Sequence, residues 1–424
     1  MEKHDDGVDK AHCEEYDLII IGAGPSGLFC AVNSAKIGRK ILLLEKKDSP
    51  GRKLLISGSG QCNITHEGDI AAFLDHYGDG GRFLRPALLG FTNCDLISFF
   101  KGKGLAFCTE NGGKIFPTTM RSRDVLDVLM KECESKGVHL RCGQIVGSVS
   151  RSESGFTVHC GERCYRSPLL VIATGGRSYP ATGSTGDGYR FAMDLGHCVT
   201  EIGPALTPVI IRDFPFSELA GLSFSELKIS IYRQRKIREV RGDILFTHQG
   251  LSGPGILDHS RFMRAGDTLK ISFVPVERRQ DLEEWLLCRT RADGSRRLRS
   301  ILAELPFCAP LPARLIDGIL EVSNIPREQR FANLSKDMRN YLVDNLTGLP
   351  LVVSELGGFD VAMVTRGGVA LKEVNPKTME SRLVKGLYLV GEVLDIDGDT
   401  GGYNLQAAFS TAMLAARSIK NNYR

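Results

Sequence analysis

The sequence predicts an α/β protein built on a parallel sheet and interrupted by an inserted region. Near the start of the 424-residue chain, two apolar runs of strand length flank a glycine turn and a helical pattern. The middle of the chain changes to alternating and then to helical patterns. The end of the chain returns to a buried strand followed by a helix. Alternation of strand and helix at both ends predicts one sheet domain that the middle segment divides in sequence.

The first element pair supports this fold class directly. Residues 16–21 (YDLIII) form a continuous apolar run of strand length, which is typical of a strand buried on both faces. A glycine turn follows at residues 22–27. Apolar residues then recur at helical spacing over 28–35, and residues 41–44 (ILLL) form a second buried strand that ends at Glu45. This is a complete βαβ unit.

The glycine turn has the spacing of a dinucleotide-binding fingerprint. Gly22 makes the tight turn, Gly24 leaves room for a pyrophosphate at the backbone, and Gly27 allows the helix to pack close to the strand. The helix start presents free N–H groups to phosphates. Glu45 ends the next strand, where a carboxylate accepts hydrogen bonds from ribose hydroxyls. The sequence therefore predicts a Rossmann-type domain that binds a dinucleotide.

Two later segments favour FAD over NAD. Residues 171–176 (VIATGG) form a strand that ends in the Ala-Thr-Gly signature typical of two-dinucleotide-binding flavoproteins. Residues 387–404 then form a strand, a glycine-rich loop and a helix start. In such flavoproteins a late acid meets the ribityl chain, and the following helix directs its positive end at the flavin C2 carbonyl. A domain that bound only NAD would not need the end of the chain.

The middle of the chain predicts an inserted region in two parts. Residues 227–231 alternate with period two, as half-exposed antiparallel strands do. Residues 278–346 are helical in pattern, and residues 361–369 predict two strands around a Gly-Gly turn, or one strand with a bulge. We therefore expect an FAD domain over 1–199 and 366–424, a β-barrel-like domain over 200–277 and 347–365, and a helical insert over 278–346.

Composition and charge narrow the class of protein. Hydrophobic residues make up 42% and charged residues 25%, which is ordinary for a globular protein, while the 47 glycines indicate tight turns. The net charge of +4 favours an anionic small ligand, and without a concentrated basic surface we expect a small-molecule substrate and neither a nucleic-acid nor a membrane partner. Two basic runs, residues 233–241 and 289–299, are interrupted by acidic or apolar residues and predict solvated faces.

The termini and the cysteines indicate a cytoplasmic protein. Residues 1–15 are polar and contain no apolar core of a signal peptide. No apolar run reaches the length of a membrane helix. The twelve cysteines form no CxxC pair, so we expect reduced thiols and no metal site.

Seven motifs spread along the chain support a family resemblance. They are GRKLLISG (51–58), CNIT (62–65), ATGG (173–176), FTHQGLSGP (246–254), TRGGV (365–369), TMES (378–381) and the stretch from GEVLD (391–395) to GGYNLQ (401–406). With these motifs the chain resembles bacterial NAD(P)/FAD-dependent oxidoreductases of the aminoacetone-oxidase-like and dehydro-bile-acid-reductase-like type. The resemblance implies non-covalent FAD and a barrel-like insert that carries helices. Gln61 stands where the family usually has Arg, so an anion-binding role at that position is in doubt.

The predicted FAD site gathers residues from all these segments. We expect cofactor contacts from Gly22, Gly24, Pro25, Ser26, Gly27, Glu45, Lys46, Lys53, Ser57, Gly58, Cys62, Asn63, Val146, Ala173, Thr174, Gly175, Gly391, Glu392, Gly401, Gly402, Tyr403 and Asn404. For the loop from Lys53 to Asn63, the alternative is a packed surface loop. Cys62 or His66 is chemically able to carry a covalent flavin bond, but the resemblance argues against one.

Two polar residues beside glycines are the candidates for catalysis. His248 is a proton donor near neutral pH, and Arg366 is a cation for an anionic substrate or for the flavin edge. The alternative for His248 is a histidine that shapes its turn. We expect both to line a cleft between the domains, because small molecules usually bind at domain interfaces.

The sequence predicts a redox enzyme that transfers two electrons between FAD and a small organic molecule. Two reactions are compatible with it: reduction of an activated C=C bond by NAD(P)H, or oxidation of an amine with O2 as acceptor. The chain has one complete fingerprint, so a pyridine nucleotide would bind transiently. An RNA-acting flavoprotein and a non-catalytic FAD-binding protein are the alternatives of another class. Substrate identity and oligomeric state are not determined.

Overall fold

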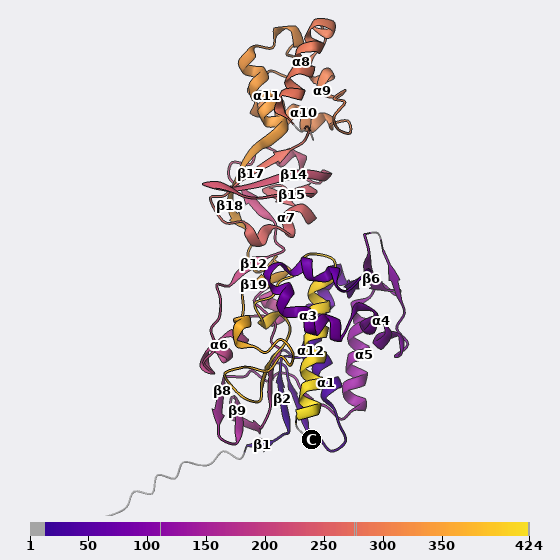
Figure 1. Ribbon diagram of the computed structural model, residues 1–424, viewed down its shortest axis with the longest axis vertical. Helices are drawn as coiled ribbons and strands as arrows, with labels where there is room; N and C mark the ends of the chain where they lie inside the picture. The colour runs from indigo at the N-terminus through magenta and orange to yellow at the C-terminus, as the bar shows by residue number, and fades with distance from the viewer. Residues whose placement is uncertain (1–12, 111, 275, 277, 423–424) are drawn as a thin grey trace, which may run out of the picture. The chain divides into compact units, whose positions relative to one another are not determined.

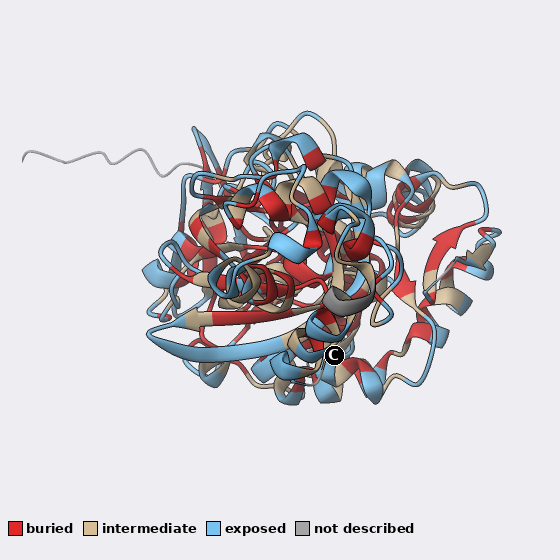
Figure 2. Cartoon of the chain, turned by 90° about the horizontal axis from the view of Figure 1, so that it is seen from above, coloured by how far each residue is buried: buried red, intermediate tan, exposed pale blue. Residues whose placement is uncertain are grey.

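The computed structural model describes residues 13–422 except 111, 275 and 277 (Figure 1). The chain forms two compact units. Unit 1 contains the chain up to Pro204 and from Met363 onward, and unit 2 contains Ala205–Ala362. Each unit has its own hydrophobic core, and the buried segments of both are marked in Figure 2.

A five-stranded parallel sheet forms the centre of unit 1. Its strand order is β20-β11-β2-β3-β7, with bounds β20 (Leu387–Leu389), β11 (Leu170–Ile172), β2 (Leu18–Ile21), β3 (Ile41–Leu44) and β7 (His139–Arg141). Leu170 pairs with Ile19 on one side and with Leu387 on the other, so the last strand of the chain lies beside β11. β2 and β3 are fully buried, as their apolar runs predict.

Helices from both ends of the chain pack together on this sheet. α1 (Pro25–Ser34) contacts both α12 (Tyr403–Asn422) and α5 (Ser122–Ser135), and the three lie side by side in Figure 1. Phe29 of α1 packs against Phe409 of α12 at a ring-centroid distance of 5.1 Å. The C-terminal segment is therefore part of the core of unit 1.

Smaller elements complete unit 1. A four-stranded sheet has the order β1-β10-β9-β8 and a three-stranded sheet has the order β4-β6-β5. The bounds of these and of the remaining elements are β1 (Glu14–Glu15), α2 (Arg52–Ile56), η1 (Ser57–Gly60), β4 (Thr65–His66), η2 (Ala72–Gly80), α3 (Gly81–Gly90), α4 (Asn93–Lys101), β5 (Phe107–Thr109), β6 (Lys114–Pro117), β8 (Ser148–Ser152), β9 (Gly155–Cys160), β10 (Arg163–Ser167), η3 (Pro180–Thr182), α6 (Asp187–Asp194), β12 (Gly203–Ala205), β19 (Val364–Arg366), η7 (Leu371–Glu373) and η8 (Gly391–Val393).

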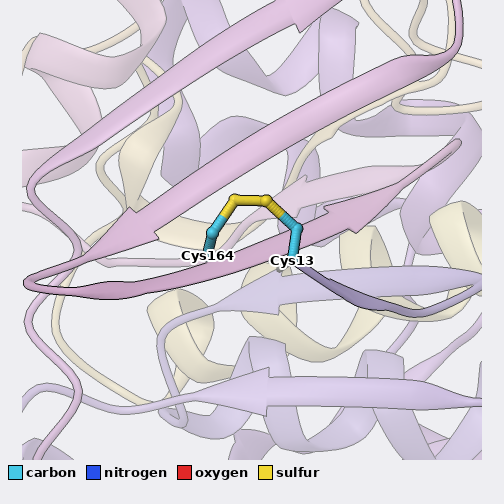
Figure 3. Close-up of a disulfide and its surroundings, with 2 residues drawn as sticks. All are labelled: Cys13 and Cys164. Atoms are coloured by element: carbon cyan, nitrogen blue, oxygen red, sulfur yellow. A yellow bond between two sulfur atoms is a disulfide. The ribbon is translucent and has the colours of Figure 1, made fainter. Parts of the chain in front are cut away.

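A disulfide corrects the prediction that all cysteines are reduced. Cys13 is bonded to Cys164, and their Cα atoms lie 4.4 Å apart across a sequence separation of 151 residues (Figure 3). Parallel pairing of β1 with β10 brings the two together, because Glu14 is in register with Tyr165. Sequence spacing gave no sign of this pair. The other ten cysteines are free.

Unit 2 contains the predicted barrel and helices. The closed barrel has the order β13-β16-β15-β14-β17-β18, with bounds β13 (Val209–Ile211), β16 (Gly250–Ser252), β15 (Arg235–Phe246), β14 (Ser223–Arg233), β17 (Thr268–Ser272) and β18 (Leu349–Leu356). Short helices of this unit are η4 (Ser217–Leu219), α7 (Pro254–Leu257), η5 (Ser260–Phe262) and η6 (Phe331–Asn333). The longer inserted helices are α8 (Arg279–Asp293), α9 (Leu298–Leu302), α10 (Ala313–Val322) and α11 (Lys336–Gly348). Barrel and helices share one apolar core, which includes Ile229 and Leu342.

This architecture confirms the predicted fold class: a Rossmann-type α/β domain with a barrel insert and a helical insert. The expectation of two strands around Gly367-Gly368 is wrong. Only β19 is a strand there, and Val369 instead forms isolated bridges with Val199 and Leu394. A Cβ on Gly368 would lie 2.5 Å from the backbone of Leu394, so these glycines permit close chain crossing rather than a hairpin turn.

Candidate functional site

The glycine turn between β2 and α1 forms an open cradle. Gly24 is the N-cap of α1, no side chain caps the helix start, and its first turn contains no acid. A Cβ added at Gly24 would meet nothing within 4 Å, whereas one at Gly27 would lie 1.8 Å from the carbonyl oxygen of Gly22. Gly22 itself has φ +103°, a conformation that favours glycine. Open space before free N–H groups fits a pyrophosphate.

Glu45 lies beside this turn at the end of β3. Its carboxylate accepts hydrogen bonds from the backbone N–H of Ala23 at 3.0 Å and of Lys47 at 2.9 Å. These bonds fix the carboxylate next to the glycine turn, and each oxygen keeps a further lone pair. Glu45 thus has the position and the acceptor capacity that ribose hydroxyls require. The neighbouring Lys46 pairs with Asp187 at 2.6 Å.

A polar network joins three of the sequence motifs and a serine that lies shortly after a fourth. Lys53 donates to both carboxylate oxygens of Glu392, at 2.7 and 3.0 Å, and to Ser178 Oγ at 2.5 Å. Ser178 also donates to Glu392 at 3.0 Å, and the backbone N–H of Thr365 donates to the same carboxylate at 2.9 Å. Lys53 and Glu392 were predicted as site residues. Ser178 was missed, although it lies only two residues after the ATGG motif.

The loop after Lys53 contains a strained cysteine and an unsatisfied amide. Cys62 is buried and has φ +62°, and burial raises the pKa of its thiol to about 12. Such a thiol stays protonated at neutral pH, which disfavours a covalent bond to flavin. Asn63 Oδ1 is buried and has no hydrogen-bond partner among the described residues. A buried acceptor of this kind suits a ligand donor.

Other predicted contact residues lie in the same unit. Ser57 donates to the carbonyl of Leu54, and Gly58 adopts φ +55° close to Asn63. Val146 is buried before β8. Gln61, which replaces the family arginine, is exposed. Residues near the ends of parallel strands and at the start of α1 complete the set: Pro25, Ser26, Ala173, Thr174, Gly175 and Gly391.

An aromatic cluster lies at the start of α12. The rings of His76 and His66 both stack on Tyr403, with centroid distances of 4.0 and 5.2 Å. His76 Nδ1 lies 3.0 Å from Asp399 Oδ2, and the buried Tyr77 hydroxyl donates to the Tyr403 carbonyl at 2.7 Å. Sequence analysis named Tyr403 but missed His76 and its pairing with Asp399, which spans 323 residues.

Glycines and an asparagine shape the loop before this cluster. Gly401 and Gly402 have φ +120° and +96°, and a Cβ on Gly402 would lie 2.6 Å from the backbone of Thr65. Asn404 accepts from Gly398 N at 2.8 Å and donates to Gly398 O at 2.9 Å. The first turn of α12 contains no acid, so its N–H groups present positive potential.

The two catalytic candidates lie in different units. His248 is exposed at a turn of unit 2, where Thr247 and Gly250 hydrogen-bond each other. Arg366 is half-buried in unit 1, lies against Gly203 and is 3.5 Å from Glu201. Their common placement in a cleft therefore stays a prediction.

Comparison with known proteins identifies the family. The model of the HI0933-like protein Rossmann domain matches residues 16–418. The chain belongs to this family. A relative named ribosomal RNA dihydrouridine synthase, from Escherichia coli (strain K12), is 34% identical over 407 residues, covering 96% of this chain and 98% of that protein. A 3-dehydro-bile acid delta(4,6)-reductase from Clostridium scindens is 30% identical over 407 residues, covering 94% and 98%.

One solved structure also aligns along nearly the whole chain. A 3-ketosteroid-delta4-(5alpha)-dehydrogenase from Rhodococcus jostii RHA1, in complex with 4-androstene-3,17-dione, has a TM-score of 0.48 and 14% identity, covering 98% of this chain and 99% of that one. The present chain is a flavoprotein of the oxidoreductase class, and its cofactor is FAD. Three features of its glycine turn and nearby loops fit FAD: the open space at Gly24, the fixed Glu45 carboxylate and the unsatisfied Asn63 oxygen.

Two features are absent from the described part of the chain. No helix there has the length and apolar character needed to cross a membrane. In the same part of the chain, no three His, Cys, Asp or Glu side chains are grouped as metal ligands. Asp399 instead pairs with His76, as described above.

Proposed function

We propose that this protein is an FAD-dependent reductase of a C=C bond conjugated to a carbonyl group, with NAD(P)H as the electron donor. The observation that carries the proposal is that two differently named relatives align over nearly the whole chain. Forming dihydrouridine saturates the uracil C5=C6 bond, which is conjugated to a carbonyl. A 3-dehydro Δ4,6 system is likewise a carbonyl conjugated to C=C bonds. Both changes add one hydride and one proton.

The reaction divides between the cofactor and the chain. Reduced FAD supplies the hydride. The chain must bind the substrate, exclude water and deliver a proton to the carbon next to the carbonyl. The carbonyl gains negative charge in this step, so a hydrogen-bond donor or the start of a helix stabilises it.

His76 is the residue that we propose as the proton donor. Its Nδ1 is engaged by Asp399, and no described residue hydrogen-bonds its Nε2, which leaves that nitrogen for a substrate. The ring is 38% exposed and is held flat against the buried Tyr403. A carboxylate behind an imidazole orients the ring and selects which nitrogen faces the substrate. His76 itself lies in η2, but its ring stacks on Tyr403, the first residue of α12, which is the helix that the sequence assigns to the flavin.

His248 and Arg366 are proposed as substrate contacts. Replacing either by alanine should leave FAD content near normal and lower the rate of flavin reoxidation by substrate. The amine-oxidase alternative has no relative of that kind among the proteins named above. The other alternative, a non-catalytic FAD-binding protein, also has no counterpart among these relatives, because both are named as enzymes.

Anaerobic stopped-flow tests the proposal in two half-reactions. FAD-loaded protein is first reduced with NADH or NADPH and then mixed with a 3-keto-4-ene steroid, with uridine or with a uridine-containing RNA oligonucleotide. We expect flavin reoxidation by at least one conjugated substrate and recovery of the saturated product. Reoxidation only by O2, or reduction of the flavin by amines, would overturn the proposed reaction.

A matched pair of variants tests the proton donor. His76→Gln should slow the oxidative half-reaction at least tenfold, shift its pH profile and leave flavin reduction by NAD(P)H unchanged. His66→Gln is the control, because His66 also stacks on Tyr403 but has its ring nitrogens 2.9 Å from Glu67 O and 2.6 Å from Gly112 O. Equal losses in the two variants would assign His76 a packing role only.

A further inference from the structure

The hairpin of β14 and β15 concentrates positive charge. We call residues 228–241, which include the turn at Gln234, the basic ribbon. It contains six basic residues and one acid, Glu239, so its net charge is +5, whereas the whole chain carries +4. The rest of the protein is therefore slightly negative. Its six cations are Lys228, Arg233, Arg235, Lys236, Arg238 and Arg241.

Three of these six cations have no acidic partner among the described residues. Arg233 pairs with Asp267, and Lys228 and Lys236 share Glu239. Arg235, Arg238 and Arg241 are exposed, and within the described part of the chain none of them forms an ion pair. The guanidinium of Arg238 lies over the ring of Phe262 at 4.3 Å, which orients it while its N–H groups remain available.

The second basic run of the sequence behaves differently. Residues 289–299 contain five arginines and one acid, for a net charge of +4. Each of its arginines with a described side chain pairs with a carboxylate: Arg289 with Asp293, Arg296 with Glu304, Arg297 with Glu328 and Arg299 with Asp317. Folding thus pairs the described arginines of this run with acids, whereas it leaves three arginines of the basic ribbon without an acidic partner among the described residues.

Protection of a sheet edge does not account for the ribbon's composition. Over residues 235–241, β15 pairs with β14 and, among the described strands, with no other on its opposite side. Exposed edges often carry a charge that prevents pairing with other chains. A single charge of either sign is enough to prevent such pairing. The ribbon has six cations and one acid, and this excess of positive charge favours an anionic partner.

We propose that the basic ribbon binds the phosphate backbone of an RNA substrate. This inference rests on the proposed reductase function and names its substrate class as uridine within RNA. The planar guanidinium of arginine can donate two hydrogen bonds to the oxygens of one phosphate. A two-stranded ribbon is also narrow enough to lie in the wide, shallow minor groove of an RNA helix. Ile237 is the one exposed large apolar side chain of the described ribbon, too little for insertion into a membrane.

This proposal reverses the expectation that the protein binds no nucleic acid. That expectation depended on the lack of a concentrated basic surface. Acidic and apolar residues interrupt the run in sequence, but strand pairing places Lys228 opposite Arg241 and Arg233 opposite Arg235. Pairing of the two strands thus concentrates charges that are dispersed along the chain.

Fluorescence anisotropy with a labelled 30-nucleotide, uridine-containing RNA hairpin tests the ribbon. The FAD-loaded full chain is compared with the triple variant R235Q/R238Q/R241Q at several KCl concentrations. Loss of three phosphate contacts should weaken binding about a hundredfold at 0.1 M KCl and lower the salt slope by about 2. The matched control R296Q/R297Q/R299Q should bind as wild type, because its arginines are already paired. The charge-preserving variant R235K/R238K/R241K should retain most of the affinity.

The outcomes separate this inference from the reductase proposal. Reduction of a small conjugated ketone should be unchanged in all three variants. If wild type reduces that ketone but binds no RNA, or if both glutamine variants lose RNA equally, the ribbon proposal is overturned and the reductase proposal stands. Binding to vesicles with anionic lipid, without binding to RNA, would also overturn it. RNA binding without reduction of any C=C bond would instead remove the proposed reaction, and with it the assignment of RNA as substrate.

Discussion

The glycine turn of unit 1 and the basic ribbon of unit 2 are both short segments that suit an anionic group, but they would bind it by different means. At the turn, backbone lies against backbone: a Cβ at Gly27 would lie 1.8 Å from the carbonyl oxygen of Gly22. On the ribbon, exposed side chains act by the sum of their charges. Binding of a cofactor at the turn depends on shape, so one added atom can abolish it. Binding of a polyanion on the ribbon depends on total charge, so each cation contributes a part of the affinity.

Truncation should have the largest effect on the shape-dependent site. A chain that ends at residue 360 lacks β20 and α12, which lie in the central sheet and core of unit 1. We expect no FAD in the purified truncated protein and no recovery on reconstitution, measured by flavin absorbance. Tight FAD binding by this truncation would contradict the split-domain arrangement.

Two glycine substitutions should separate folding from cofactor binding. Gly27→Ala should destabilise unit 1 by about 3 kcal/mol, because the new methyl overlaps backbone that cannot move freely. Gly24→Val should leave the melting temperature of the apoprotein nearly unchanged and abolish FAD binding, because its side chain fills space that is open only without the pyrophosphate. Thermal melting and FAD titration of both apoproteins check this contrast. Normal FAD affinity in Gly24→Val would place the phosphates elsewhere.

Loss of one polar contact should have a smaller effect at the same site. Glu45→Ala should weaken FAD binding by roughly 1–3 kcal/mol, the range for a hydrogen bond to a charged group. Titration of the apoprotein with FAD measures the change, and Lys47→Ala, which keeps the backbone N–H that Glu45 accepts from, serves as its control. Wild-type affinity in Glu45→Ala would remove the ribose assignment.

A single charge on the ribbon should have the smallest effect. Lys236 and Lys228 hold the pKa of Glu239 at about 2, so this carboxylate is ionised above that pH and repels phosphate throughout pH 5–8. Glu239→Gln should raise RNA affinity by about fivefold, one unit of charge, and the gain should be the same at pH 5 and pH 8. A gain that disappears at pH 5 would mean that Glu239 is protonated there in the wild type.

Much of the FAD cradle was predictable because its signals are local. The order strand, glycine turn, helix and acid occupies one short segment, and β2, α1 and β3 formed as expected. Contacts between distant segments were harder to predict. The pairs Cys13–Cys164, Lys53–Glu392 and His76–Asp399 depend on which strands and loops become neighbours in space. Spacing within the sequence contains no information about such pairs.

The sequence by itself determined that this chain folds around a parallel sheet and carries a dinucleotide fingerprint, since backbone sterics make those glycines necessary wherever they occur. Only the tertiary structure decided which basic side chains form ion pairs. Residues 233–241 and 289–299 look alike as basic runs, but folding brings Glu304, Asp317 and Glu328 to the second run, while the first keeps three arginines without acidic partners among the described residues. Coulomb interactions act through space, so the net charge of a surface follows from the folded neighbours and not from the order of residues.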